Sequence, residues 1–84
     1  MRSAEQLYYP DTDGAYAVEM FDGVEITIVG TYGPTTAEGQ VTRIFPRLRA
    51  VRVTYEDGFP ARGQRVRRSV RVPIAACTFL GRDG

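Results

Sequence analysis

The chain of 84 residues has no histidine and no lysine, and it contains a single cysteine, Cys77. Without histidine, the commonest metal ligand and general base is missing, and a lone cysteine cannot form an internal disulfide bond. The sequence also lacks a phosphate-binding loop, a dinucleotide-binding fingerprint and a Cys-x-x-Cys pair. We therefore expect no catalytic residues, no metal site, no cofactor and no small-molecule substrate, and the sequence predicts a protein that is not an enzyme.

One residue and one short segment still carry side chains that can act as a nucleophile or as metal ligands. Cys77 has only arginine available as an activating neighbour, so we expect a buried, small apolar residue rather than a nucleophile. The segment Asp11-Thr12-Asp13-Gly14 resembles the first half of a calcium-binding EF-hand loop, but the remaining ligands are absent. An Asx-type turn accounts for this segment better than a metal site does.

Long apolar runs are missing as well. No run approaches the roughly 18 residues that a membrane helix needs, and the residues that follow Met1 are polar rather than the apolar core of a signal peptide. We therefore expect a cytoplasmic protein with no membrane partner. The composition, with 43% hydrophobic and 25% charged residues, nine glycines and five prolines, is typical of a small globular domain built from short strands and tight turns.

All eleven basic residues are arginine, and the formal net charge is only +1. Residues 1–42 hold one arginine and seven acidic residues, a net charge of −6, whereas residues 43–84 hold ten arginines and three acidic residues, a net charge of +7. This asymmetry indicates an interaction surface. The alternative is that acidic and basic strands are neighbours in the fold and pair across the sheet, each exposed pair contributing about 0–1 kcal/mol.

The pattern of apolar residues and turn signals divides the chain into short strands. Asp22-Gly23 lies between two apolar-rich runs, 15–21 and 24–28, and predicts a hairpin there. Glycine, threonine and proline predict turns over 30–39. Further strands are expected at 40–45, 49–56, 65–72 and 78–80, with a helical turn over 74–77. We expect an N-terminal arm (1–14), one small β-domain (15–81) and a polar tail (82–84), and five or six strands without a substantial helix predict an all-β barrel.

Part of this pattern resembles the KOW motif of SH3-like barrels. The resembling segments are 22–30 (DGVEITIVG), 39–44 (GQVTRI), 51–53 (VRV) and the turn 57–58. The resemblance implies an SH3-like barrel, similar to KOW and Tudor modules, in a family whose members contact RNA, DNA or polymerase in ribosomal proteins and transcription elongation factors. After Gly30 the chain departs from the family pattern, because it has Thr31-Tyr32-Gly33-Pro34 where the family usually has a Lys-Gly pair.

The densest charge cluster is an arginine run in the second half of the chain. Alternation places Val66, Val70 and Val72 on the inner face of a strand and arginines on its outer face, where Arg52 joins them from the neighbouring strand. Like charges side by side on a sheet are unfavourable unless an anionic partner neutralises them. The candidate contact residues for phosphate are Arg52, Arg62, Arg65, Arg67, Arg68 and Arg71, and Phe59 and the Tyr8-Tyr9 pair are candidate stacking platforms for bases or packing residues.

These observations predict a non-enzymatic binding module whose arginine-rich strand face holds the phosphate backbone of a nucleic acid, or docks on a nucleic-acid machine. The alternative is a structural or adaptor protein that forms a homo-oligomer or a larger complex, as small β-barrel components of phage particles do. Its acidic interface residues would be Glu19, Glu25 and Glu56. A third hypothesis is a small regulator that docks on a larger machine such as polymerase.

Overall fold

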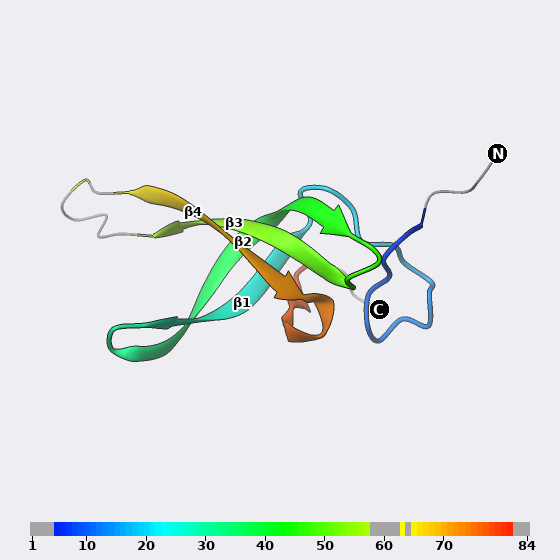
Figure 1. Ribbon diagram of the computed structural model, residues 1–84, viewed down its shortest axis with the longest axis horizontal. Coiled ribbons are helices and arrows are strands. Elements are labelled where there is room, and N and C mark those ends of the chain that lie inside the picture. Colours follow the sequence, from blue (N-terminus) through cyan, green and yellow to red (C-terminus); the bar gives the residue numbers. More distant parts are fainter. Residues whose placement is uncertain (1–4, 58–62, 64, 82–84) are drawn as a thin grey trace.

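Five antiparallel strands form one open sheet in the computed structural model, which describes residues 5–57, 63 and 65–81. The spatial order is β4-β3-β2-β1-β5 (Figure 1), so β4 and β5 lie at the two edges and the long strand β2 lies at the centre. The elements are β1 (Gly23–Gly30), β2 (Gly33–Phe45), β3 (Ala50–Asp57), β4 (Val66–Pro73), a turn of 3-10 helix η2 (Ile74–Ala76) and β5 (Thr78–Phe79). The prediction of an all-β fold is confirmed for the described residues.

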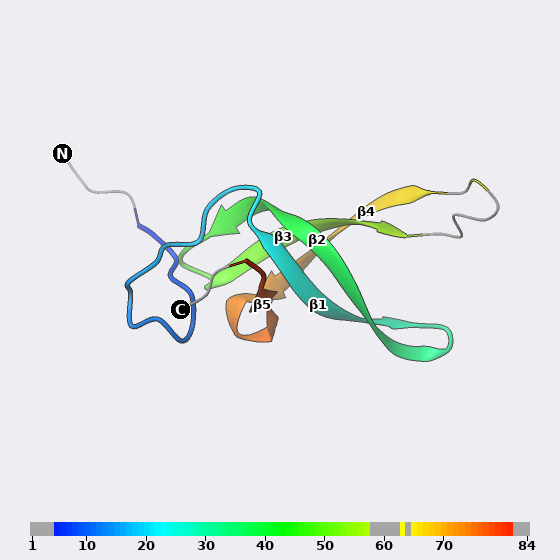
Figure 2. The same cartoon turned by 180° about the vertical axis from the view of Figure 1, so that it is seen from behind.

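The strands at 49–56 and 65–72, the helical turn after Pro73 and the short closing strand were predicted and are confirmed as β3, β4, η2 and β5. β5 pairs with β1, Val24 lying opposite Phe79, and the two are adjacent in the view from behind (Figure 2). The β1–β2 hairpin and the paired strands β3 and β4 extend toward the same end of the molecule (Figure 1). The N-terminal segment and η2 lie at the opposite end.

The predicted hairpin at Asp22-Gly23 is wrong. Gly23 is the first residue of β1, and the actual hairpin joins β1 to β2 through Thr31 and Tyr32, with Gly30 opposite Gly33. Gly33 has a φ of 105°, a conformation that glycine adopts at little cost and that closes the short loop. Residues 15–21 form no strand of the sheet, and Ala17 makes only an isolated bridge.

The turns that were expected over 30–39 are also wrong beyond Gly33, because residues 33–45 form one strand of 13 residues. Its β-branched Thr35 and Thr36 favour extended backbone and pair with Ile28 and Thr27 of β1. Gly39 lies where β2 and β3 approach closely. A Cβ at this position would be 2.5 Å from the carbonyl oxygen of Thr54 and 2.8 Å from a methyl group of Val53. The glycine is therefore required by packing between the two strands.

The hydrophobic core lies on one face of the sheet. Val24, Ile26, Val41, Val51 and Val53 are at most 2% exposed, and they come from the three central strands. The end of the core is covered by residues before and after the main strands, namely Leu7, Tyr9, Val18, Ile74 and Cys77. The N-terminal segment therefore packs against the sheet.

Tyr9 fixes this segment by contacts on two sides. Its ring packs edge-on against Phe79 at a centroid distance of 4.4 Å, and its hydroxyl donates a hydrogen bond to the carboxylate of Asp22. Cys77 is buried, as expected, and its thiol donates a hydrogen bond to the carbonyl oxygen of Pro73 at 3.5 Å. Burial raises the pKa of the Cys77 thiol.

Candidate functional site

A β-bulge in β2 controls which side chains reach the face of the sheet opposite the core, here called the outer face. Val41 pairs with Val53 and both are buried, but the register then shifts, so that Arg43 rather than Thr42 lies opposite Arg52. The extra residue reverses the alternation of β2 from this point. Arg43 consequently points to the outer face, and Ile44 lies opposite the core residue Val51. Bulges commonly re-aim side chains in this way next to functional sites.

The bulge completes a row of three arginines across three strands, here called the arginine row: Arg43 of β2, Arg52 of β3 and Arg71 of β4. Arg52 is directly opposite both of the others, and neighbouring strands lie about 4.8 Å apart. All three are exposed. Among the described residues, no carboxylate lies within ion-pair distance of the arginine row. The ion pairs of the described residues involve Arg47, Arg65 and Arg68 instead. The row is therefore a concentrated and uncompensated positive charge.

Phe45 lies beside the arginine row and contacts the arginines at its two ends. The guanidinium carbon of Arg43 is 5.0 Å from the centre of the Phe45 ring, and that of Arg71 is 5.9 Å from it. Such cation–π contacts at exposed sites contribute about 0.5–1 kcal/mol each. The residue opposite Phe45 is Ala50, whose small side chain leaves room for Arg71 to extend toward the ring from β4.

A second row, here called the hydroxyl row, lies next to the arginines on the same face. The side-chain oxygens of Thr42 and Thr54 are 2.9 Å apart, and those of Thr54 and Ser69 are 3.0 Å apart. The row crosses β2, β3 and β4, and Thr42 also donates to the carbonyl oxygen of Arg52 at 3.5 Å. These hydroxyl groups can donate to or accept from a ligand.

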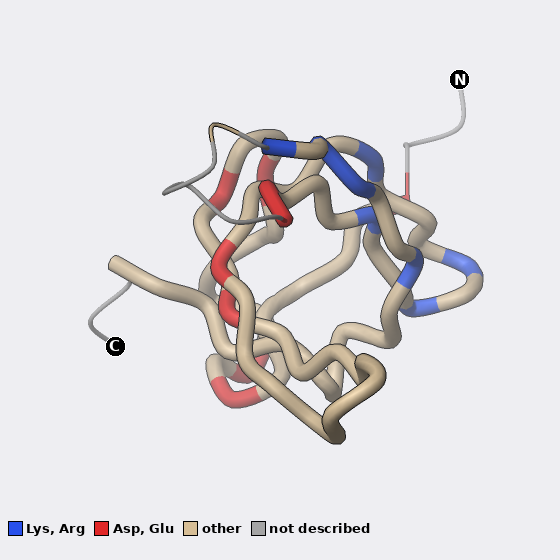
Figure 3. The backbone as a smooth tube through the Cα atoms, turned by 90° about the vertical axis from the view of Figure 1, so that its left-hand side faces the viewer, with Lys and Arg blue, Asp and Glu red and all other residues tan. Residues whose placement is uncertain are grey.

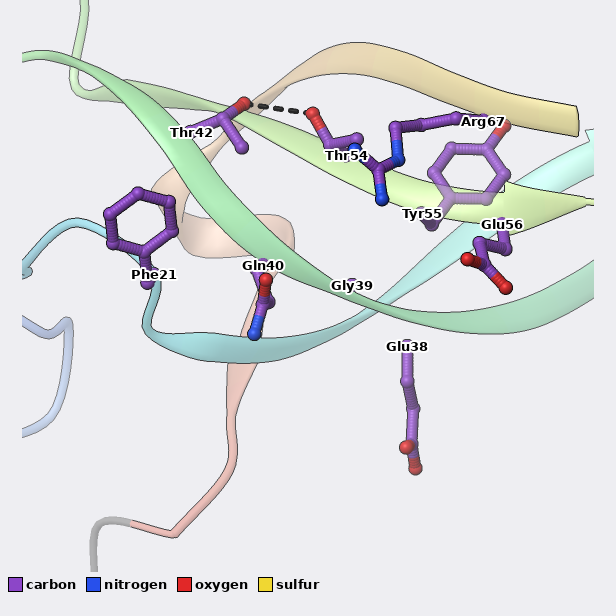
Figure 4. Close-up of a pocket in the computed structure, with 9 residues that line it drawn as sticks. All are labelled: Phe21, Glu38, Gly39, Gln40, Thr42, Thr54, Tyr55, Glu56 and Arg67. Carbon is purple, nitrogen blue, oxygen red and sulfur yellow. Dashed lines mark hydrogen bonds between the residues drawn. The ribbon is translucent and has the colours of Figure 1, made fainter.

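A groove of about 370 Å³ continues from the hydroxyl row toward the other end of the outer face. Phe21 and Arg67 lie on opposite sides of it, with Gln40, Thr42 and Thr54 between them (Figure 4). Glu38 and Glu56 line its far end. The groove, the hydroxyl row and the arginine row thus form one polar surface over β2, β3 and β4.

The predicted arginine run is divided by the structure. Arg52 and Arg71 belong to the arginine row, and Arg67 lies on the same face, opposite Glu56. Arg65 lies 3.5 Å from the carboxylate of Glu56, and Arg68 lies 3.0 Å from that of Asp57.

Register also separates Arg68 from the arginine row, because Arg68 lies opposite Tyr55, whose ring packs against the core side of the sheet. The arginine run is therefore not one continuous face. Two further predicted residues, Arg62 and Phe59, lie outside the described residues. Of the tyrosine pair, Tyr9 is buried in the core and Tyr8 is 39% exposed.

Most of the described acidic residues occupy a different side of the molecule from the arginines. Figure 3 shows the described arginines on one side of the backbone and most of the acidic residues on the other. Glu25 of β1 lies directly opposite Glu38 of β2, a like-charged pair in the register. Glu19 precedes β1, whereas Glu56 lies on β3 and is paired with Arg65. Of the three predicted interface residues, Glu25 thus lies opposite Glu38 and Glu56 lines the same groove as Glu38, whereas Glu19 lies in the segment before the sheet.

Sequence reasoning missed Arg43, Phe45 and Phe21. The signal for the first two was the spacing between Val41 and Ile44, because two apolar residues that face the core three positions apart on a strand require a bulge. No pattern indicates Phe21, which is 65% exposed and has a φ of 69°.

Within the described part of the chain, no cluster of three histidine, cysteine, aspartate or glutamate residues is arranged to hold a metal ion. Nor does a described helix have the length and apolar character of a membrane-crossing segment. Comparison with protein-family models, with curated proteins and with solved structures found no match. The function must therefore be argued from the geometry of the outer face.

Proposed function

We propose that the protein is a non-enzymatic nucleic-acid-binding module with an SH3-like fold, and that the outer face of β2, β3 and β4 binds the phosphate backbone. The arginine row is the observation that carries this proposal. Three arginine residues lie opposite one another in the register, with no described carboxylate to pair with them. Like charges in this register destabilise the sheet, and a bound polyanion removes the repulsion.

The chemistry of the surface suits phosphate in two further ways. Guanidinium groups bind phosphate oxygens through two parallel hydrogen bonds, which makes arginine a specific phosphate ligand. The hydroxyl row supplies neutral donors beside the arginines, and serine and threonine contribute to many backbone contacts in protein–nucleic acid complexes. Backbone contacts of this kind carry no sequence information, so we expect binding with little sequence selectivity.

The SH3-like part of the proposal rests on the topology. β1 and β5, the first and last strands in the chain, pair with each other, a single 3-10 turn leads into β5, and Gly39 allows close approach of β2 and β3. An all-antiparallel sheet in which the last strand of the chain returns beside the first is compatible with a small β-barrel fold.

The test is a fluorescence-anisotropy titration with labelled single- and double-stranded oligonucleotides at several salt concentrations. The double variant Arg52→Gln/Arg71→Gln is compared with Arg65→Gln/Arg68→Gln, which removes the same charge from residues already paired with Glu56 and Asp57. The first variant should reduce the log–log salt slope by about 1.4–1.8, since each phosphate contact contributes about 0.7–0.9. The second should leave the slope nearly unchanged. Equal effects of both variants would contradict the assignment to the arginine row.

A second candidate function is head-to-tail self-assembly, which the separation of charge in Figure 3 favours. Glu25 and Glu38 form a like-charged pair that a second copy's arginine row would neutralise. Light scattering on the same samples distinguishes the two functions. Under self-assembly the wild-type mass exceeds that of the 9.3 kDa monomer, and Glu25→Gln/Glu38→Gln reduces it. Under nucleic-acid binding this variant leaves the mass close to that of wild type and does not weaken the binding of oligonucleotides.

A further inference from the structure

We infer that Phe21 is a stacking platform for one unpaired base, so that the ligand of the outer face is single-stranded rather than duplex. This inference rests on the proposed function and specifies the ligand class of the same site. It depends on the backbone at Phe21, the contacts that hold it and the groove beside it.

The backbone at Phe21 is strained while its ring is exposed. The residue has a φ of 69°, which is unfavourable for any residue with a Cβ atom, and its side chain is 65% exposed. An exposed phenylalanine gains little from folding, so packing of its own ring does not account for the strain. Strained residues of this kind are concentrated at binding sites, where the surrounding structure holds them in place.

The turn that carries Phe21 is held on both sides. The backbone N–H of Phe21 donates to the carbonyl oxygen of Val41 at 2.7 Å, and the N–H of Val41 donates back to the carbonyl oxygen of Asp22 at 2.9 Å. The carboxylate of Asp22 accepts hydrogen bonds from the hydroxyl of the buried Tyr9 and from the N–H of Glu19. The backbone at Phe21 is therefore anchored to both β2 and the N-terminal segment, which keeps this residue beside the groove.

The groove beside the ring offers polar groups to the edge of a base. Gln40, Thr42 and Thr54 line it between Phe21 and Arg67 (Figure 4). An amide and two hydroxyl groups provide both donors and acceptors. A base that stacks on Phe21 can place its edge toward these groups.

The charges around the groove determine where the phosphate backbone of a bound nucleic acid lies. Glu38 and Glu56 line the far end of the groove and repel phosphate, whereas Arg43 follows Thr42 directly on β2 and attracts it. The phosphate backbone is therefore directed along the arginine row, and a base can enter the groove. In a duplex the bases are paired and stacked on one another, so only an unpaired base can stack on an aromatic side chain.

The test uses labelled oligo(dT), oligo(U) and a mixed-sequence DNA duplex in the anisotropy titration. Phe21→Ala should weaken single-strand binding about 5- to 150-fold, the range expected for loss of one base–aromatic stack, and should leave duplex binding unchanged. Phe21→Tyr should restore single-strand binding. Tyr32→Ala is the matched control, because Tyr32 is a fully exposed aromatic residue at the tip of the β1–β2 hairpin, away from the groove.

Phe21→Gly separates stacking from folding, since glycine adopts the positive φ without strain. This variant should stay folded by circular dichroism and lose the same affinity as Phe21→Ala. Equal losses on single strand and duplex, or no loss on either, would overturn the inference while leaving backbone binding by the arginine row in place. If wild type binds neither probe, the proposed function itself fails and the inference fails with it.

Discussion

Reversing the central charge of the arginine row should stabilise the fold while it abolishes the proposed binding. Arg52 lies directly opposite both Arg43 and Arg71. Arg52→Glu replaces two opposed like-charged pairs with two opposed ion pairs, and each cross-strand pair is worth about 0.2–1 kcal/mol. Because all three side chains are exposed, we expect a gain of about 1 kcal/mol in the free energy of unfolding. For a domain of this size that raises Tm by about 4–8 °C.

Thermal unfolding followed by circular dichroism measures this effect at low salt and again at 1 M salt. Screening at 1 M reduces the Debye length to about 3 Å, so the gain should shrink substantially. The matched control is Arg67→Glu, because Arg67 lies opposite Glu56 in the same two strands. This reversal creates a like-charged pair and should lower Tm.

A lower Tm for Arg52→Glu, or a shift of Tm in the same direction for both reversals, would contradict the predicted repulsion within the arginine row. A gain that persists unchanged at high salt would also count against it, because the effect would then come from packing or strand propensity. Arg52→Gln should give an intermediate Tm, since it removes the repulsion without adding attraction.

Three further predictions concern the fold. Gly39→Ala should lower the free energy of unfolding by about 1–3 kcal/mol in urea titrations, because the new methyl group meets the Thr54 carbonyl oxygen at 2.5 Å and β3 must shift; unchanged stability would show that the strands separate easily. Deleting Thr42 removes the bulged residue and leaves Val41, Arg43 and Ile44 in regular alternation, with Arg43 still opposite Arg52, so cooperative unfolding should persist in the same assay; its loss would contradict this register. Burial raises the pKa of the Cys77 thiol, so the folded state keeps the thiol neutral at a pH where the unfolded state ionises it. The free energy of unfolding is therefore unaffected below the ordinary thiol pKa and decreases as pH rises from there through the raised pKa. A Cys77→Ala variant should lose this part of the alkaline pH dependence of the urea midpoint, and an identical profile would contradict it.

The second half of the chain was predicted well because its residues alternate regularly. Valine residues point to the core side at a spacing of two, Val51 and Val53 on β3 and Val70 and Val72 on β4. β4 ends at Pro73, directly before η2. Local pattern and tertiary structure agree there, which is why the bounds of β3 and β4 were predicted to within one residue.

The first half was predicted poorly because tertiary contacts override its local signals. Asp22-Gly23 has the composition of a hairpin turn, but the Asp22 carboxylate is bound by Tyr9 and Glu19, and Gly23 pairs with Gln40. Tyr9 and Gln40 are 13 and 17 residues away from their partners along the chain, so no short window of sequence contains these contacts.

The candidate site was predicted only in part. Arg52 and Arg71 were placed on the outer face by alternation, but an irregular register brought Arg43 and Phe45 to the same face. The ion pairs of Arg65 and Arg68 depend on which acidic residues lie across the strand pair. Periodicity gives the face of a residue and does not give its neighbour on the next strand.

The position of β4 at the edge of the sheet gives its arginines a second role. An edge strand leaves backbone N–H and C=O groups free to pair with a strand of another molecule, which leads to edge-to-edge aggregation. β4 has eight residues, and Arg67, Arg68 and Arg71 lie along it, whereas β5 at the opposite edge has only two residues. One edge is thus protected by charge and the other by its shortness. Variants that neutralise β4 to remove binding therefore also remove a barrier to aggregation, which makes charge reversal the safer design.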